Sequence, residues 1–159
     1  MSTPVLETKL PRVGTTIFAT MSELATQVKA VNLGQGFPDF DCDPALIDHV
    51  NQAMRDGHNQ YPPMPGVMPL RQAVSDKIAS LYGKRYDPAS DITITAGATQ
   101  AIINAVIATV RPGDEVLVLE PCYDSYQPNI EMVGGTVVRV PLDPGSFRPN
   151  FAAIANALS

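Results

Sequence analysis

The sequence predicts an α/β fold in which helices cover a parallel sheet. Segments rich in β-branched and apolar residues, at 91–95, 115–119 and 136–140, alternate with segments of helical periodicity. The middle segment is apolar on both faces from Val116 onward, as expected of a strand buried between two helical layers. Strands and helices that alternate in this order form parallel sheets.

The first half of the chain is expected to be helical. Apolar residues recur at helical spacing over 16–29. Asp43 is a suitable N-cap for a helix over 44–56, which begins with a proline and stops before a glycine. A further helix is expected over 69–82, and its buried face should consist of Leu70, Ala73, Val74, Ile78 and Leu81.

Three more helices are expected in the second half. The first covers 99–110, after a turn of small residues, and the second covers 123–133. Glycine-containing turns follow both, and a last helix begins near Asn150. Three strands are few for a parallel sheet, and the chain stops in or just after a helix, so we expect the large domain to be incomplete.

Composition excludes several functions. The chain has 159 residues, of which 45% are hydrophobic and 17% charged, as in a globular protein. A net charge of -5 without a basic cluster argues against nucleic-acid binding. The apolar runs are too short for a membrane span, and neither histidine has a partner at metal-ligand spacing. The irregular arm 1–14 has no signal-peptide pattern, and Cys42 and Cys122 suggest no disulfide framework, which favours a cytoplasmic protein.

The first candidate site is the turn Thr-Ala-Gly-Ala-Thr-Gln at 95–100. A strand that passes through small residues directly into a helix leaves the first helical amides without partners. Together with the helix dipole and the Thr99 hydroxyl, these amides could bind a phosphate. Taken alone, the turn fits an ordinary strand-to-helix connection better, with Thr99 as a cap. The dinucleotide-binding pattern Gly-x-Gly-x-x-Gly is absent here.

The second candidate is Glu-Pro-Cys-Tyr-Asp-Ser-Tyr at 120–126, directly after the apolar strand. Ligands of open α/β sheets bind beyond the carboxyl ends of the strands, where the turn at 95–100 is also expected. Tyr123 or Tyr126 could therefore stack on a flat heteroaromatic ring. Equally, both tyrosines could simply close the core.

Two loops of the first half complete the candidates. The segment 32–40 contains Gly34 and Gly36 beside aromatic residues, which would allow a close approach of the backbone to a substrate carboxylate. The segment 59–66 is rich in proline, and Tyr61 could reach a partner subunit. By themselves, both segments are better explained as turns.

Together, these segments resemble the class I and II aminotransferases of the fold-type-I pyridoxal phosphate group. The similarity is strongest to the branch of methionine aminotransferase and kynurenine aminotransferase (glutamine transaminase K), and it runs from Leu10 onward. Five motifs support it at family spacing: Leu-Gly-Gln-Gly-Phe-Pro-Asp-Phe at 33–40, Asn-Gln-Tyr at 59–61, Thr-Ala-Gly-Ala-Thr-Gln-Ala at 95–101, Pro-Gly-Asp-Glu-Val at 112–116 and Pro-x-Tyr-Asp-x-Tyr at 121–126.

The resemblance implies a three-layer αβα fold and pyridoxal 5'-phosphate as cofactor. Residues 1–43 would form an arm and a small-domain segment, and 44–159 part of the cofactor-binding large domain. A homodimer with shared sites is implied. The expected roles are phosphate binding by Ala98, Thr99 and Gln100, ring stacking by Tyr123, contact with the partner subunit's cofactor phosphate by Tyr61, binding of the substrate carboxylate by Gly36, and lining of the side-chain pocket by Phe18, where some relatives have Trp.

The catalytic lysine of the family has no counterpart here. The lysines present are expected in the arm or at helix surfaces and ends, so we expect this chain alone to be inactive. The whole protein would transfer the amino group of a methionine-, glutamine- or aromatic-type amino acid to a 2-oxo acid. Two alternatives stay open: a cysteine-conjugate β-lyase on the same scaffold, and a fragment without catalytic function. The four lysines are Lys9, Lys29, Lys77 and Lys84.

Overall fold

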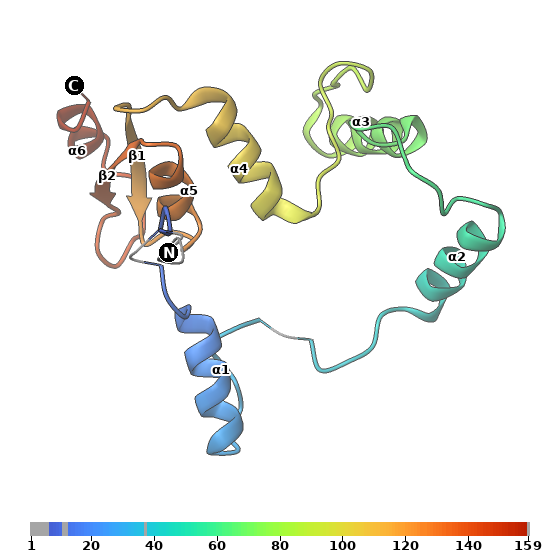
Figure 1. The fold of residues 1–159 in the computed structure, drawn as a ribbon, viewed down its shortest axis with the longest axis horizontal. Helices are drawn as coiled ribbons and strands as arrows, with labels where there is room; N and C mark the ends of the chain where they lie inside the picture. The colour runs from blue at the N-terminus through green and yellow to red at the C-terminus, as the bar shows by residue number, and fades with distance from the viewer. Residues whose placement is uncertain (1–6, 11–12, 37, 159) are drawn as a thin grey trace, which may run out of the picture. The chain divides into compact units, whose positions relative to one another are not determined.

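The computed structural model describes residues 7–10, 13–36 and 38–158 (Figure 1). These residues form two compact units. The sheet unit comprises the described residues up to Ala30 and those from Ala96 on, and the helical unit comprises 31–95. The sheet unit contains α1 (Ile17–Gln27), α4 (Gly97–Thr109), β1 (Glu115–Glu120), α5 (Tyr126–Met132), β2 (Thr136–Pro141) and α6 (Phe151–Asn156), and the helical unit contains α2 (Pro44–Arg55) and α3 (Met68–Tyr82).

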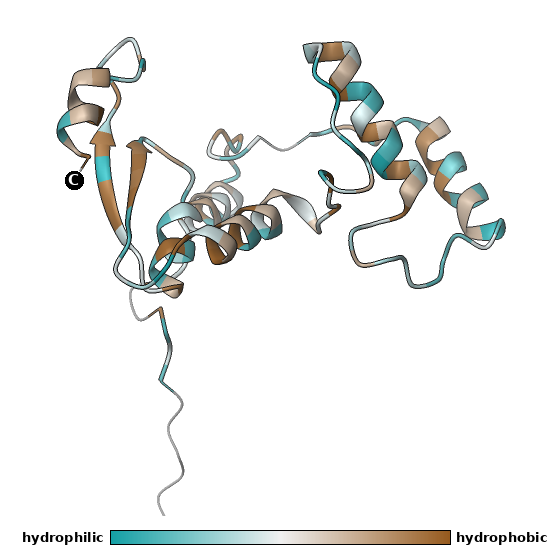
Figure 2. Ribbon diagram, turned by 90° about the horizontal axis from the view of Figure 1, so that it is seen from above, coloured by the Kyte–Doolittle hydropathy of each residue, from teal (hydrophilic) through white to brown (hydrophobic). Residues whose placement is uncertain are grey.

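The sheet unit is organised around two parallel strands. β1 and β2 pair in register from Glu115 opposite Thr136 to Glu120 opposite Pro141, and both strands are largely hydrophobic (Figure 2). The helix α5 connects them and packs against β2 and α4. The buried apolar side chains of the described residues, Val118, Ile130 and Val140, lie in this unit. The predicted strands 115–119 and 136–140 are therefore confirmed, each one residue longer than expected.

The predicted strand at 91–95 is wrong. The segment lies in the helical unit, whose described residues contain no strand with which it could pair. Its Ile94 amide instead donates a hydrogen bond to the carbonyl of Pro65, at 3.0 Å. Since a strand exists only when a neighbouring strand accepts its ladder of hydrogen bonds, β-branched composition alone does not produce one.

The helix α5 begins at Tyr126, three residues later than predicted. Residues 121–125 form a loop after β1, which starts with a cis peptide bond before Pro121. The amide of Tyr126 donates to the carbonyl of Tyr123 at 3.2 Å, so Tyr123 belongs to a turn and not to the helix. The helix α4, by contrast, begins two residues earlier than predicted, at Gly97.

In the helical unit, α2 begins and α3 ends at the predicted signals. The Asp43 carboxylate accepts a hydrogen bond from the amide of Ala45 at 2.8 Å and thereby caps α2. Gly83 ends α3 in the left-handed conformation, with φ of 69°. Among the helices formed by the described residues, none combines the length and apolar content that crossing a bilayer requires.

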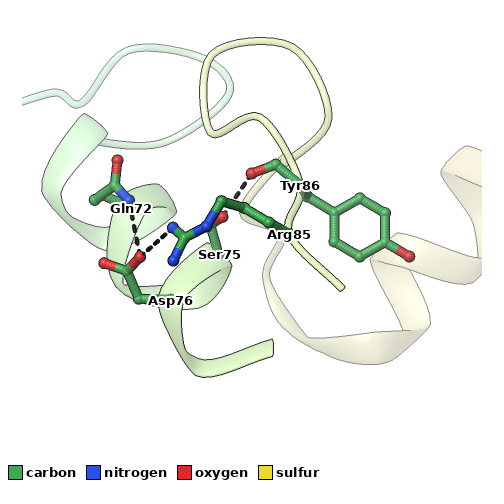
Figure 3. A network of polar contacts seen from close by, with 5 residues as sticks. All are labelled: Gln72, Ser75, Asp76, Arg85 and Tyr86. Atoms are coloured by element: carbon green, nitrogen blue, oxygen red, sulfur yellow. Dashed lines mark hydrogen bonds and ion pairs between the residues drawn. The ribbon is translucent and has the colours of Figure 1, made fainter. Parts of the chain in front are cut away.

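The buried face of α3 differs from the prediction. Leu70 and Leu81 are exposed, whereas Arg71 and Ser75 are buried. The cause is the segment 86–89, which presents backbone carbonyls to this face of the helix: Ser75 donates to the carbonyl of Tyr86 at 2.5 Å (Figure 3), and Arg71 donates to those of Pro88 at 2.7 Å and Ala89 at 3.2 Å. Polar side chains are buried here because backbone acceptors lie opposite them.

Candidate functional site

The start of α4 is open and lacks a side-chain cap. Gly97 has φ of 82°, and a Cβ atom at this position would meet nothing within 4 Å. The N-cap residue Ala96 has no side chain that could accept a hydrogen bond from the helix. Ala98 and Thr99 follow in the first turn and are both exposed. Since the amides of Ala98 and Thr99 have no acceptor within the helix, they are available as donors at the positive end of the helix dipole.

Gln100 holds the turn that precedes α4. Its side-chain oxygen accepts a hydrogen bond from the amide of Ala96 at 2.5 Å. The donor that Gln100 can offer to an anion is consequently its side-chain NH₂ group, because its backbone N–H is the first to be bonded within the helix. The turn is thus closed by a neutral amide rather than a carboxylate, so no negative charge from this contact would repel a phosphate.

A cleft of about 600 Å³ lies within the sheet unit, between the start of α1 and the segment that follows β1. Phe18 of α1 and Tyr123 both line it, and their expected roles at a substrate and a cofactor stay predictions. The start of α4 is not among the described residues that line it. The lining consists of Val13, Gly14, Thr15, Thr16, Ile17, Phe18, Tyr123, Asp124, Ser125, Gln127, Pro128 and Glu131.

The two aromatic rings at the cleft differ in how they are held. Tyr123 contacts Tyr126 edge to face, with 5.9 Å between the ring centroids and 83° between the planes. As a residue Tyr123 is 44% exposed, so it is accessible to a ligand. Phe18 follows the N-cap Thr16, whose hydroxyl oxygen accepts from the amide of Ala19 at 3.2 Å and so fixes the start of α1.

Gly36 and Tyr61 lie in the helical unit. Gly36 is exposed, and a Cβ atom there would meet nothing within 4 Å, so its backbone is accessible. Tyr61 is 100% exposed. Their expected contacts, with a substrate carboxylate and with a cofactor in the partner subunit, stay predictions.

The polar side chains around Tyr123 were not predicted from the sequence. Ser125 lines the cleft, and its buried hydroxyl has no hydrogen-bond partner among the described residues. Gln127 donates to the carboxylate of Glu131 at 2.7 Å, one helical turn away. The four-residue spacing of Gln127 and Glu131 on one helix could have predicted this contact. In contrast, the further contact of Gln127 with Arg139 of β2 could not be found from local sequence.

None of the four lysines lines this cleft. Lys29 follows Val28, the C-cap of α1, and has φ of 54°. In the helical unit, Lys77 is exposed on α3, and the Lys84 amine lies 4.8 Å from the centroid of the Tyr86 ring. The described residues also contain no group of three or more His, Cys, Asp or Glu placed to hold a metal ion.

Comparison with known proteins shows the family. The family model for aminotransferase class I and II matches residues 28–159, so the chain belongs to this family. The Escherichia coli K12 methionine aminotransferase is 50% identical over 153 residues, which cover 96% of this chain and 40% of that protein. Human kynurenine–oxoglutarate transaminase 1 is 37% identical over 128 residues, covering 79% and 30% of the two chains.

Solved structures show the same fold. An Escherichia coli protein with a methionine aminotransferase function matches with a TM-score of 0.93 and 48% identity, over 99% of this chain and 41% of that one. N-succinyldiaminopimelate aminotransferase from Mycobacterium tuberculosis matches with a TM-score of 0.89 and 44% identity, over 98% and 41%. The predicted fold class is confirmed. The chain spans about 40% of the length of these relatives.

Proposed function

We propose that the protein carrying this chain is a pyridoxal-phosphate-dependent aminotransferase, and that this chain supplies the phosphate-binding helix start and the tyrosine that faces the cofactor ring. The observation that supports this most directly is the open first turn of α4, with uncapped amides at Ala98 and Thr99. The names of the relatives, which are aminotransferases for methionine, succinyldiaminopimelate and kynurenine, support the same activity.

The residues present fit the cofactor. The Ala98 and Thr99 amides and the Thr99 hydroxyl would donate to phosphate oxygens, and the small side chains at 96–98 leave room for them. The half-exposed Tyr123 ring would lie against the pyridine ring. When bound, the cofactor supplies an electron sink for the substrate's α-carbon.

The group that exchanges the proton at the α-carbon is not among the lysines of this chain. We propose that the lysine that holds the cofactor covalently lies outside these residues, and that the chain alone does not transaminate. Borohydride treatment of the isolated chain with cofactor should leave no covalently attached pyridoxyl group. A stable pyridoxyl adduct on one of the four lysines would contradict this proposal.

The cleft around Phe18 and Tyr123 supports an amino donor with a neutral, apolar side chain of the methionine, glutamine or aromatic type. Ile17, Phe18 and Tyr123 provide apolar surface, and the described lining includes Asp124 and Glu131 but no lysine or arginine that would pair with an acidic substrate. Steady-state rates with methionine, phenylalanine and aspartate as donors test this. Preference for aspartate would contradict it.

Assembly and location are proposed by family resemblance. The protein would act as a cytoplasmic homodimer in which Tyr61 reaches the partner's cofactor phosphate, and Gly36 would contact the substrate carboxylate. The full exposure of Tyr61 in the described chain leaves its hydroxyl accessible for such a contact. We propose that 44–159 belong to the cofactor-binding large domain and 1–43 to the arm and small domain.

Two substitutions in one helix test the phosphate site. Thr99→Val removes the hydroxyl at the start of α4, and Thr109→Val removes a hydroxyl at its end, where it donates to the carbonyl of Ala105 at 2.8 Å. Loss of a hydrogen bond to a charged group should weaken binding of pyridoxal phosphate roughly ten- to hundredfold in Thr99→Val only. Binding of pyridoxal, which lacks the phosphate, should change little.

The dissociation constants of pyridoxal phosphate and of pyridoxal are measured by titration of the protein carrying this chain. The proposed phosphate site would be contradicted if Thr99→Val and Thr109→Val weakened the binding of pyridoxal phosphate equally. It would also be contradicted if Thr99→Val weakened the binding of both ligands equally.

A further inference from the structure

Arg139 of β2 contacts both flanks of the loop that contains Tyr123. Its Nε atom lies 3.2 Å from a carboxylate oxygen of Glu120, the last residue of β1. Its Nη2 group donates to the side-chain oxygen of Gln127, the second residue of α5. The loop 121–125 lies between these two residues. One guanidinium therefore joins the start and the end of the segment in which Tyr123 lies.

The orientation of Gln127 is determined by a second partner. Its side-chain NH₂ group donates to the Glu131 carboxylate at 2.7 Å, which directs its oxygen toward Arg139. The reverse orientation would place the NH₂ group against a guanidinium, which has no acceptor. In the series of contacts from Glu131 through Gln127 and Arg139 to Glu120, every donor therefore faces an acceptor.

An arginine is required for this arrangement. The planar guanidinium presents N–H groups in fixed directions, so Nε and Nη2 can serve two partners on different elements at the same time. A lysine has one ammonium nitrogen on a flexible stem and would have to serve both partners from a single point.

Among the described residues, few other hydrogen bonds hold the loop, one of them from the amide of Asn129 to the carbonyl of Ser125 at 3.3 Å. The backbone of Glu120 is fixed by the amide of Leu142, which donates to its carbonyl at 2.8 Å. Within the loop, Tyr123 is held by its turn hydrogen bond to Tyr126 and by the edge-to-face contact of the two rings. The position of the Tyr123 ring therefore depends on how α5 packs relative to the end of β1. Arg139 contacts both of these elements.

We propose that Arg139 is a positioning residue for Tyr123, and that it raises cofactor affinity by fixing the loop 121–125 without touching the cofactor. This inference rests on the proposed function, in which Tyr123 faces the cofactor ring. The side chains of Arg139 and Glu120 are 51% and 39% exposed, and ion pairs of such exposure contribute little to global stability. The effect of losing Arg139 should consequently appear in cofactor binding more than in unfolding.

A double-mutant cycle tests the inference in the protein carrying this chain. Arg139→Met is made with Tyr123 present and with Tyr123→Ala, and the dissociation constant of pyridoxal phosphate is measured for each protein. With Tyr123 present, Arg139→Met should weaken binding about threefold to tenfold; with Tyr123→Ala, it should change binding less than about twofold. A purely structural role predicts the same loss in both backgrounds.

Two further variants provide controls. Arg85→Met removes another exposed ion pair, with Asp76 at 2.6 Å, and should change cofactor binding less than about twofold. Gln127→Met removes one of the two contacts of Arg139 and should show a smaller loss with the same dependence on Tyr123. Gln127→Met keeps the inference testable if Arg139→Met does not fold.

The outcomes separate the two proposals. If Tyr123→Ala alone leaves cofactor affinity unchanged, both the ring contact of the proposed function and the inference built on it are overturned. If Tyr123→Ala weakens binding but Arg139→Met has no effect, or has an effect independent of Tyr123, only the positioning role fails.

Discussion

The substitution Gly66→Ala tests how tightly the loop that follows Tyr61 packs against Ile94, which lies in the same helical unit. Gly66 is buried, with φ of 98°, and its amide donates to the carbonyl of Pro63 at 2.8 Å in a turn. A Cβ atom at this position would overlap Cγ1 of Ile94 and lie 2.8 Å from its Cβ. The clash involves a branched side chain near its backbone, so it cannot be relieved by rotation of a flexible end.

Two terms give the magnitude. A positive φ costs a residue with a Cβ atom about 1–2 kcal/mol, and insertion of a methyl group into packed surroundings costs about 1–3 kcal/mol. Gly66→Ala should therefore lower the free energy of unfolding by roughly 2–5 kcal/mol. Gly57 has a similar φ of 91°, but a Cβ atom there would meet nothing within 4 Å. Gly57→Ala should consequently cost only the conformational term.

Urea denaturation of the protein carrying this chain, followed by circular dichroism, provides both values. The difference between the two variants isolates the contact with Ile94, because the backbone term is common to both. If Gly57→Ala destabilises as much as Gly66→Ala, the loop does not pack on Ile94 as described. Ile94→Ala should partly restore the stability of Gly66→Ala, since it removes the atoms with which the new methyl group overlaps.

Further predictions concern the contacts of α3 (Figure 3). Ser75→Ala leaves the Tyr86 carbonyl without its donor and should cost about 1–3 kcal/mol of unfolding free energy, whereas the exposed Ser80→Ala should be nearly neutral in the same denaturation experiment. The hydrogen bond from Arg85 lowers the pKa of Asp76 below its ordinary value of 3.8. The stabilisation that ionised Asp76 gains from this hydrogen bond is complete above the ordinary pKa value. It is lost as the pH falls through the lower pKa that Asp76 has in the folded protein. Arg85→Met should raise the Asp76 pKa in an NMR titration; an unchanged pKa would contradict the assigned cause.

Candidate site residues could be proposed from the sequence where their signals are local. The small residues at 96–98 and the helix that follows them are adjacent in the chain, and so are β1 and Tyr123. A pocket shared by Phe18 and Tyr123 was expected from family resemblance, since no local pattern connects residues so far apart. The polar contacts of Arg139 were not predicted, because they join β2 to residues of β1 and α5.

The sequence alone determined where α2 begins, where α3 ends and to which family the chain belongs. Capping by Asp43, the left-handed Gly83 and the five motifs depend on neighbours within a few residues, so they can be recognised without coordinates. Only the tertiary structure decided that 91–95 has no strand partner among the described residues and that α3 buries Arg71 and Ser75. Pairing and burial depend on which distant groups lie opposite a segment, and composition does not encode that arrangement locally.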